Sequence, residues 1–296
     1  MKPLFRLALA LSLFAQTHIH AQEIPCAWST VERIVAVGDV HADGDQLIAC
    51  LRAGGVIDEQ QKWIGGKTHL VQLGDLLDPG TDLKKVMDLL MALEVQAQEA
   101  GGRVHALLGN HELMILNDTH NDLGETEVAS FGGLNEYRKA MRADGKYGKW
   151  LRSHNTVIKI NDLLFVHGGL SSDYATLSLE AINTGVRDAM NHPASRNMAH
   201  DPQGPLWFRS LALEENPQKL GGMLAPILRG YGVKHVVIGH TITGTRKITA
   251  KAGGALIMTD VGMSDTYGRG SAMCLVIEKG KFFSVTPAKK QKLQVE

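Results

Sequence analysis

One pattern occurs three times in the first half of the chain, and it constrains the fold more than any other feature. In each case a short aliphatic run, typical of a strand buried inside a sheet, leads into a glycine and then into polar side chains. The glycine allows the backbone to turn sharply where the strand ends. Because ligands bind at the carboxyl ends of strands in open α/β sheets, three neighbouring strands would bring these side chains together. The three instances span residues 34–41, 70–78 and 104–112, and their polar residues are Asp39, His41, Asp75, Asn110 and His111.

Helical patterns separate the three predicted strands. Residues 43–53 follow a capping aspartate, and residues 81–100 place apolar side chains at helical spacing. This strand–helix–strand order predicts parallel strands with right-handed crossovers. Another helix is expected to open at Gly109-Asn110-His111-Glu112, which would place His111 in a loop or in the first helical turn.

The second half of the chain is expected to add a hairpin, two more helices and an antiparallel tail. Residues 156–160 and 163–166 are typical of two strands joined by a tight turn, and the second strand runs into His167. Residues 117–153 are polar and contain glycines, which indicates a cap-like excursion beside the site. Helices are predicted at 174–191 and 219–231, a strand at 235–238 ending in His240, and alternating antiparallel strands and turns at 245–284.

The first 21 residues have the pattern of a signal peptide. Basic residues precede an apolar run at 7–15, and Ala21 is a small residue at a plausible cleavage point. This run is shorter than the roughly 20 residues that a membrane-spanning helix needs. The sequence therefore predicts a periplasmic or secreted protein without a stable membrane anchor, and an uncleaved N-terminal anchor is the alternative. No linker or low-complexity tract divides residues 22–296, which suits a single domain.

Charge and cysteine content argue against two classes of protein. Lys plus Arg and Asp plus Glu are both 31, so the net charge gives no reason to expect nucleic acid as a partner. Three cysteines are too few for a disulfide scaffold, and no Cys-x-x-Cys spacing is present. Cys26 and Cys50 could pair in an oxidising compartment, whereas Cys274 is expected to be a small buried hydrophobic residue.

The strand-end residues form a ligand set that suits divalent transition metals. Carboxylate, amide and neutral imidazole groups favour Mn, Fe, Co or Zn over Ca or Mg. Six ligands exceed what one tetrahedral zinc site takes, but they suit two ions that share a bridging carboxylate. Two such ions can ionise water and hold the oxygens of a displacement at phosphorus. The six residues are Asp39, His41, Asp75, Asn110, His167 and His240.

The chain at this point resembles the calcineurin-like metallophosphoesterases. Five motifs stand in the order of that family, each after an apolar strand, and the resemblance covers residues 35–271. Each motif alone is common, but the ordered series is specific. The chain is most similar to the protein-phosphatase branch and, within it, to the bacterial-type Shewanella-like phosphatases. The motifs are Gly38-Asp39-x-His41, Gly74-Asp75-x-x-Asp78, Gly109-Asn110-His111-Glu112, His167-Gly168-Gly169 and Gly239-His240, with Leu206-Trp207-Phe208-Arg209 also matching that branch.

The resemblance implies an α/β fold, a two-layer mixed β-sandwich flanked by helices, and two divalent ions, with Mn, Fe or Zn expected. It also divides the ligands between the ions. Asp39, His41 and Asp75 would hold the first ion, and Asp75, Asn110, His167 and His240 would hold the second.

The resemblance further implies a role for the remaining motif residues. His111 would be the general acid that protonates the leaving oxygen, and Asp78 would orient it. Arg209 would bind phosphoryl oxygens as a bidentate fork, with Asn110 also contacting the phosphate. The implied substrate is a phosphorylated protein or a small phosphomonoester. The implied reaction is direct attack by a hydroxide that bridges the two ions, and no Cys or Ser lies in a motif that would suit a phosphoenzyme.

Two residues depart from the family pattern. Pro79 stands where the family usually has a phosphate-clamping arginine, and proline cannot donate a hydrogen bond. Ala42 replaces a usual glycine, a change expected to leave ligation intact. The missing arginine leaves open a phosphodiesterase or nucleotide pyrophosphohydrolase on the same centre. A non-catalytic metal- or phosphate-binding protein is the third possibility, against which the pairing of His111 with Asp78 argues. Arg138, Arg187 or Arg246 could replace the missing arginine from elsewhere.

Several other polar or aromatic residues are open to structural interpretations. Trp207 is expected to pack rather than to bind substrate, and Glu112 could equally support the ligands or begin a helix. Tyr267 lies in a loop bounded by glycines that could border the site. Structural or exposed positions are predicted for His69, His105 and His235.

Overall fold

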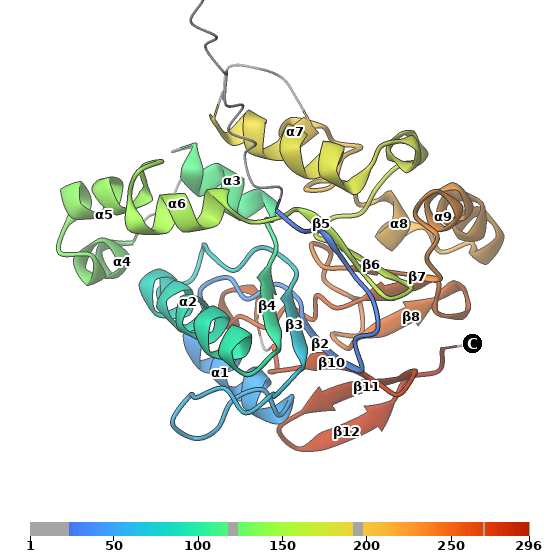
Figure 1. Cartoon of the computed structure of the whole chain (residues 1–296), viewed down its shortest axis with the longest axis horizontal. Helices are drawn as coiled ribbons and strands as arrows, with labels where there is room; N and C mark the ends of the chain where they lie inside the picture. The colour runs from blue at the N-terminus through green and yellow to red at the C-terminus, as the bar shows by residue number, and fades with distance from the viewer. Residues whose placement is uncertain (1–23, 118–123, 192–197, 269, 296) are drawn as a thin grey trace, which may run out of the picture.

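The computed structural model describes residues 24–117, 124–191, 198–268 and 270–295 (Figure 1). The expected signal peptide, residues 1–21, lies outside the described residues, as does part of the expected excursion, residues 118–123. Among the described residues, no helix combines the length and the apolar character needed to cross a membrane.

Two six-stranded sheets form the centre of the molecule (Figure 1). The first sheet has the order β12-β11-β10-β2-β3-β4 and contains the three strands of the repeated pattern. As predicted, β2 (Arg33–Val37), β3 (His69–Gln72) and β4 (Arg103–Ala106) lie side by side and run parallel. Every residue of β2 after Arg33 is at least 99 % buried, because helices cover one face of the sheet and the second sheet covers the other. The antiparallel half comprises β10 (Cys274–Glu278), β11 (Lys281–Thr286) and β12 (Lys289–Lys292).

The second sheet has the order β1-β5-β6-β7-β9-β8. Its β5–β6 pair is the predicted antiparallel hairpin, and β7 lies parallel to β6. The expectation of a purely antiparallel tail is wrong at β9, which runs parallel to β7. The chain between β7 and β9 returns through β8 to the edge at which β7 began, and this return makes the parallel pairing possible. The strands are β1 (Ala27–Trp28), β5 (Val157–Ile160), β6 (Leu163–Val166), β7 (His235–Ile238), β8 (Thr249–Lys251) and β9 (Leu256–Met258).

Helices α1 (Gly44–Ala53) and α2 (Leu83–Glu99) pack beside the first sheet, and α7 (Leu179–Asn191), α8 (Ser210–Leu213) and α9 (Pro217–Tyr231) lie beside the second (Figure 1). Local sequence accounts for several helix ends. The Asp43 side chain accepts a hydrogen bond from the Gln46 backbone N–H at 3.0 Å and caps α1. A short 3₁₀ turn at Ser172–Thr176 precedes α7, so the predicted helix at 174–191 is divided in two.

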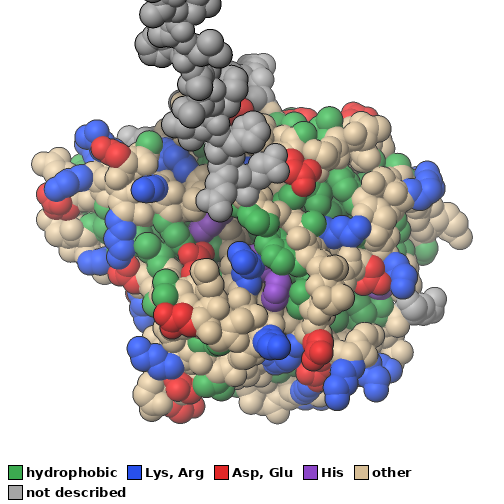
Figure 2. All heavy atoms as spheres, viewed as in Figure 1, with side chains coloured by type: hydrophobic (Ala, Val, Ile, Leu, Met, Phe, Trp, Pro, Cys, Tyr) green, Lys and Arg blue, Asp and Glu red, His purple; other side chains and the backbone are tan. Residues whose placement is uncertain are grey.

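Three short helices form a projection beside the first sheet, at the left of Figure 1. They are α4 (Glu125–Ser130), α5 (Leu134–Met141) and α6 (Lys146–Arg152), and they fall within the predicted excursion at 117–153. Helix α3 (Asn110–Leu116) connects β4 to this region. On the face shown in Figure 2, Lys and Arg side chains are interspersed with Asp and Glu side chains over the projection and the sheets.

None of the three cysteines forms a disulfide, so the pairing considered for Cys26 and Cys50 does not occur. The two residues are held in different parts of the fold. The Cys26 thiol donates to Oε1 of Glu180 at 3.0 Å, whereas Cys50 in α1 lies against Cys274 at the start of β10. Cys274 is fully buried, as expected.

Candidate metal centre

The six candidate ligands come together at the carboxyl ends of five strands drawn from both sheets. Asp39 and His41 follow β2, Asp75 follows β3, and Asn110 is the first residue of α3 after β4. His167 follows β6 and His240 follows β7 in the second sheet. Contacts across the sheets join the two groups, since Nε2 of His167 lies 3.2 Å from Oδ2 of Asp75 and 3.0 Å from Oδ1 of Asn110.

The loops that carry these residues have strained backbones. His41, Asp75, Asp78 and His240 have φ angles of 49°, 49°, 42° and 63°, values that residues with a Cβ atom seldom adopt. Such angles persist where surrounding bonds enforce them, and they concentrate at functional sites. Here the backbone N–H groups of Val40 and His41 both donate to the Asp75 carbonyl at 2.9 Å, which ties the loop after β2 to the loop after β3.

Two glycines that follow strands, Gly109 of the repeated pattern and Gly239 before His240, permit close approach of the ligand carboxylates. A Cβ atom on Gly109 would lie 2.2 Å from Oδ1 of Asp75, and one on Gly239 would lie 2.3 Å from Oδ1 of Asp39. No side chain fits at such distances. The glycines expected to allow sharp turns therefore also make room for the ligands of a neighbouring loop.

The hydrogen bonds of His167 direct its Nε2 atom toward other potential metal ligands. Its Nδ1 atom lies 2.8 Å from the Leu73 carbonyl oxygen, which can only accept, so Nδ1 carries the proton of the neutral ring. The Nε2 lone pair then faces two further acceptors, Oδ2 of Asp75 and Oδ1 of Asn110, and also Nδ1 of His240 at 3.1 Å. Atoms that bind one ion at about 2.1 Å lie about 3 Å apart at neighbouring coordination positions, so these spacings suit a shared divalent metal.

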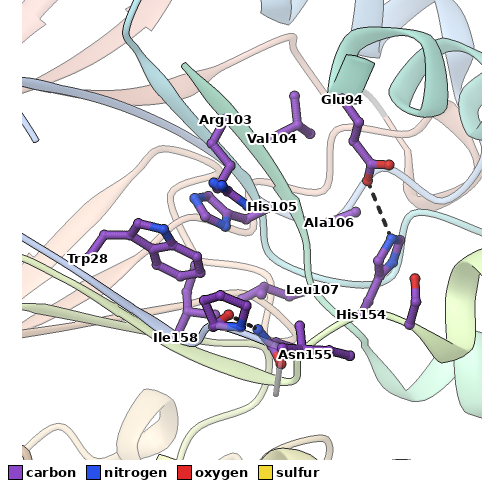
Figure 3. A pocket seen from close by; sticks show the side chains of 13 residues that line it. Trp28, Glu94, Arg103, Val104, His105, Ala106, Leu107, His154, Asn155 and Ile158 are labelled. Atoms are coloured by element: carbon purple, nitrogen blue, oxygen red, sulfur yellow. Dashed lines mark hydrogen bonds and ion pairs between the residues drawn. The ribbon is translucent and has the colours of Figure 1, made fainter. Parts of the chain in front are cut away.

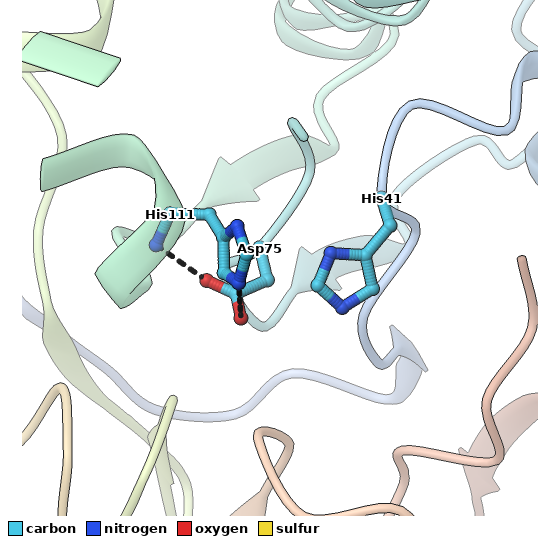
Figure 4. Close-up of side chains that lie close together, drawn as sticks. All are labelled: His41, Asp75 and His111. Atoms are coloured by element: carbon cyan, nitrogen blue, oxygen red, sulfur yellow. Dashed lines mark hydrogen bonds and ion pairs between the residues drawn. The ribbon is translucent and has the colours of Figure 1, made fainter. Parts of the chain in front are cut away.

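His41 is oriented in the same way on the other side of Asp75. Its Nδ1 atom lies 2.5 Å from the Asp78 carbonyl oxygen, which leaves Nε2 to face Oδ2 of Asp39 at 3.8 Å. Figure 4 shows the backbone nitrogen and the ring of His111 both directed at the carboxylate of Asp75, with the ring of His41 nearby. Both oxygens of Asp39 accept the backbone N–H of His240 at 3.0 Å, so Asp39 also connects the two sheets.

Two groups of potential ligand atoms share Asp75. His41, Asp75 and His111 form one group, and Asp75, His167 and His240 form the other; within each group all ligand atoms lie within 4.8 Å of one another. The first group contains His111, whereas the ligand set predicted for that ion contains Asp39, whose Oδ2 lies 3.8 Å from Nε2 of His41. The shared carboxylate and the mixture of imidazole, carboxylate and amide donors fit two neighbouring divalent ions.

His111 and Asp78 form a hydrogen-bonded pair beside the predicted metal ligands. Nδ1 of His111 lies 3.0 Å from Oδ2 of Asp78, and its Nε2 lies 3.9 Å from Oδ2 of Asp75. Burial opposes protonation of the ring, but the hydrogen bond to Asp78 and the charges of Asp75 and Asp78 outweigh it and raise the pKa of His111 to about 9. His111 therefore keeps a proton on the ring nitrogen that faces Asp75, beside the predicted metal ligands.

Glu112 supports the ligand loops, one of the two roles that the sequence left open. It is 1 % exposed, and its Oε2 atom accepts the backbone N–H groups of Asp75 and Gly109, both at 2.8 Å. Its Oε1 atom accepts the N–H of Leu77 at 3.1 Å. One carboxylate thus satisfies three backbone donors and joins two loops that carry ligands.

The arginines occupy different surroundings. The exposed Arg209 lies at the edge of the centre, where Nη1 donates to the His240 carbonyl oxygen and to Oγ1 of Thr241. Arg187 donates to the carbonyl oxygen of His154 and to Oδ1 of Asn155, and Arg246 donates to the carbonyl oxygens of Gly262 and Tyr267. Arg138 is exposed on α5. Arg187 and Arg246 are thus hydrogen-bonded to protein oxygens, as Arg209 is.

Two aromatic residues and one acid complete the surroundings. The Tyr267 ring lies 4.6 Å from the ring of His41, so its loop does border the site, and Arg246 holds that loop. Trp207 donates from Nε1 to the Ala199 carbonyl oxygen at 2.8 Å, as a packing residue does.

Asp260 was not singled out from the sequence. It follows the aliphatic strand β9 and precedes Gly262, and this arrangement is a variant of the same strand-end pattern.

A separate cavity of about 110 Å³ lies at the open edge where β4 faces β1 and β5 (Figure 3). Trp28 and His105 line it with ring centroids 4.3 Å apart, and Nε2 of His154 lies 3.4 Å from Oε1 of Glu94. His105 bonds to His69 through ring nitrogens 3.0 Å apart, and burial with the charge of Arg103 lowers the pKa of His69 to about 4. These histidines stand apart from the metal-binding loops, in the structural positions expected for them.

Comparisons with known proteins agree with this geometry. A model of the calcineurin-like phosphoesterase family matches residues 32–244. Shewanella-like protein phosphatase 2 of Arabidopsis thaliana is 29% identical over 300 residues, which cover 84% of this chain and 75% of that protein. Shewanella-like protein phosphatase 1 of Plasmodium berghei is 29% identical over 274 residues, which cover 86% and 74%.

Solved structures give the same result. The cold-active protein-tyrosine phosphatase of a psychrophilic Shewanella species has a TM-score of 0.80 and 29% identity, covering 92% of this chain and 83% of that one. A point mutant of a cold-active protein tyrosine phosphatase has a TM-score of 0.83 and 31% identity with the same coverage. The family model spans most of the chain, and the two sheets bring all five motifs to one centre. The chain therefore belongs to the calcineurin-like phosphoesterase family.

Proposed function

We propose that this metal-dependent phosphatase hydrolyses phosphomonoesters on proteins, with His111 as the general acid. The observation that carries the proposal is the hydrogen bond between His111 and Asp78, placed beside the carboxylate that both ligand groups share. A site that only bound metal or phosphate would have no use for an oriented acid.

The donor geometry supports the assignment of ligands that the family resemblance implies. Asp39, His41 and Asp75 would hold one ion, and Asp75, Asn110, His167 and His240 would hold the other. When bound, divalent ions such as Mn, Fe or Zn would supply Lewis acidity to the phosphoryl group and to water.

The protein's own groups would do the remaining work. Asp78 fixes the tautomer of His111 by accepting from Nδ1, so the proton available for the leaving oxygen is the one on Nε2. The Arg209 guanidinium, free on its exposed side, would bind phosphoryl oxygens, and the Asn110 amide would contribute a further contact. Because Pro79 offers no donor, Arg209 would carry more of the phosphate binding than one member of an arginine pair does.

A phosphorylated protein is the substrate class that the relatives support. The two relatives from Arabidopsis thaliana and Plasmodium berghei are named protein phosphatases, and the two solved structures compared above are named protein tyrosine phosphatases. We therefore propose phosphotyrosine as the first substrate to test, with phosphoserine and phosphothreonine as the alternatives.

The first test measures metal content and hydrolysis of an aryl phosphomonoester on the mature chain, with and without added Mn²⁺. About two ions per chain and metal-dependent turnover support the proposal. Release of phosphate from matched phosphotyrosine, phosphoserine and phosphothreonine peptides then identifies the phosphorylated residue. Absence of bound metal together with absence of turnover would contradict the two-ion mechanism.

A phosphodiesterase acting on the same centre is the alternative that Pro79 favours. A phosphodiester presents fewer charged oxygens to the site than a phosphomonoester does, so its binding depends less on the missing arginine. Comparing an aryl phosphomonoester with the matching aryl phosphodiester separates the two functions, since a true monoesterase should prefer the monoester by a wide margin.

We also propose that the protein acts in the periplasm or outside the cell. The support is the leader pattern of residues 1–21. N-terminal sequencing of the protein recovered from a cell envelope extract should find a mature chain that starts near Gln22, whereas an intact Met1 in the cytoplasmic fraction would contradict the proposal.

A further inference from the structure

Asp260 lies behind the metal centre, in the turn that follows β9. Strand β9 pairs with β7, and the backbone N–H of Thr243 donates to the Asp260 carbonyl at 3.0 Å, so the turn packs on the loop after His240. On its other side, a Cβ atom at Gly38 would lie 3.0 Å from the Asp260 backbone nitrogen. The residue is thus held between the loop that carries His240 and the loop that carries Asp39.

The side chain of Asp260 is a buried carboxylate with one local hydrogen bond. It is 2 % exposed, and Oδ1 accepts the backbone N–H of Gly262 at 2.8 Å. A neutral acceptor would satisfy that donor equally well. The turn alone therefore does not account for a buried negative charge, which costs several kcal/mol unless a cation compensates it.

The charge of Asp260 acts on the predicted ligands. Burial raises the pKa of Asp39 well above its usual range, and the charge of Asp260 is the next largest cause, followed by that of Asp75. Burial and the charge of Asp75 in turn raise the pKa of Asp260 to about 6. Like charges in one buried volume repel each other, and the repulsion is relieved when divalent cations enter.

Besides Asp78, which pairs with His111, four buried acids interact at the centre, and their combined charge equals that of two divalent ions. The four carboxylates, on Asp39, Asp75, Glu112 and Asp260, are each no more than 2 % exposed, and the charges of the last three all raise the pKa of Asp39. Glu112 is occupied by three backbone N–H groups, and Asp39 and Asp75 are predicted ligands. Asp260 is the member of this set that neither the ligand assignments nor the backbone account for.

We propose that Asp260 is a positioning residue of the metal centre, whose buried negative charge beside Asp39 raises the affinity of the site for its ions. The inference rests on the proposed two-ion function. Residues that support metal ligands from outside the coordination sphere typically change metal affinity 10–100-fold when mutated.

The substitution Asp260→Asn separates this role from a structural one. Asparagine keeps an oxygen for the Gly262 N–H and removes only the charge. Without metal, the loss of a like charge should leave the melting temperature of the apoprotein unchanged or higher. With metal, the affinity should fall. A purely structural role would move stability and affinity in the same direction or leave both unchanged.

The experiment titrates Mn²⁺ into the metal-free full-length mature protein by calorimetry or against a fluorescent chelator, and records the melting temperature of each apoprotein. We expect Asp260→Asn to weaken Mn²⁺ binding about 10-fold or more. Asp260→Ser also keeps a hydrogen-bond acceptor in the turn without the charge, and it should weaken Mn²⁺ binding to a similar extent. It replaces the asparagine variant if that variant folds poorly. The control Asp265→Asn removes the same charge from an exposed position in the same loop and should change affinity less than about twofold.

Unchanged affinity in both Asp260 variants would overturn the inference, as would a fall in apoprotein stability that parallels the fall in affinity. Failure of the wild-type protein to bind Mn²⁺ would instead contradict the proposed function. The titration of the wild-type protein therefore tests the proposed function, and the ratio of the Mn²⁺ affinities of variant and wild type tests the role of Asp260.

Discussion

The imidazole of His111 has a carboxylate near each nitrogen, Asp78 at 3.0 Å from Nδ1 and Asp75 at 3.9 Å from Nε2. The backbone of His111, by contrast, is tied to the centre independently of the ring, since its N–H donates to Oδ1 of Asp75 at 2.9 Å. Replacing the ring therefore removes the proton donor while the bond that orients Asp75 remains. This separation allows a sharp test of the acid role.

We expect His111→Asn to retain its bound ions but to lose about 10²- to 10⁴-fold in turnover on phosphoesters with poor leaving groups. Esters of acidic phenols should suffer much less, because their leaving oxygen needs little protonation. The measurement compares kcat for a series of aryl phosphates and records metal content for both proteins. Equal losses across the series would count against the acid assignment, and lost metal would show that the ring acts as a ligand.

At the scale of elements, the short-range features were predictable and the pairings between distant segments were not. Strands β2, β3 and β4 follow from aliphatic runs that end in glycine, and α1 follows from its capping Asp43, because these signals are local. The parallel pairing of β9 with β7 depends on how residues 239–255 return across the sheet, and no local pattern encodes that path. The motif residues themselves were found because their spacing in sequence reflects strand ends.

Helix α4 of the projection contains a buried acid whose titration should be visible in stability. Glu127 is 2 % exposed; Oε2 accepts the Gly124 N–H at 2.8 Å, and Oε1 has no hydrogen-bond partner among the described residues. Burial, helped by the charge of Asp78, raises the pKa of Glu127 to about 7. The pKa of this carboxyl group is about 4.5 in the unfolded chain and about 7 in the folded protein, so the folded protein holds the proton more tightly. The stability that the bound proton contributes is complete below pH 4.5 and is lost as the pH rises through 7.

We therefore expect Glu127→Gln to be more stable than the wild type by about 2 kcal/mol at pH 8, with the difference vanishing near pH 4.5. Urea unfolding of both proteins at several pH values measures this difference. Glu125→Gln, which removes an exposed carboxylate from the same helix, should show no such dependence. A difference that grows as pH falls would contradict the buried neutral carboxyl group.

At the scale of the whole molecule, the centre depends on an arrangement that the sequence only partly predicts. The motif series indicated which residues gather, but not that His167 and His240 come from a different sheet than Asp39 and Asp75. Nor did it indicate that Asp260 enters the same buried volume, because a lone strand-end aspartate also occurs at ordinary turns. The assembly of two sheets decides which of many polar residues become neighbours.

Because the ligands come from both sheets, bound metal should stabilise the whole fold and not only the loops. Nε2 of His167 faces Oδ2 of Asp75 across the sheets at 3.2 Å, and without a metal ion the buried carboxylates repel one another. Ions at 100 times their dissociation constant contribute about 2.7 kcal/mol each, or about 5.4 kcal/mol for two, so chelation should lower the melting temperature by about 10 to 20 °C. The measurement is thermal unfolding with Mn²⁺ and with excess EDTA. The matched variant Asp75→Asn, which alters the residue shared by both ligand groups, should respond little to EDTA. A wild-type melting temperature that ignores EDTA after saturation with Mn²⁺ would show that metal does not bridge the sheets.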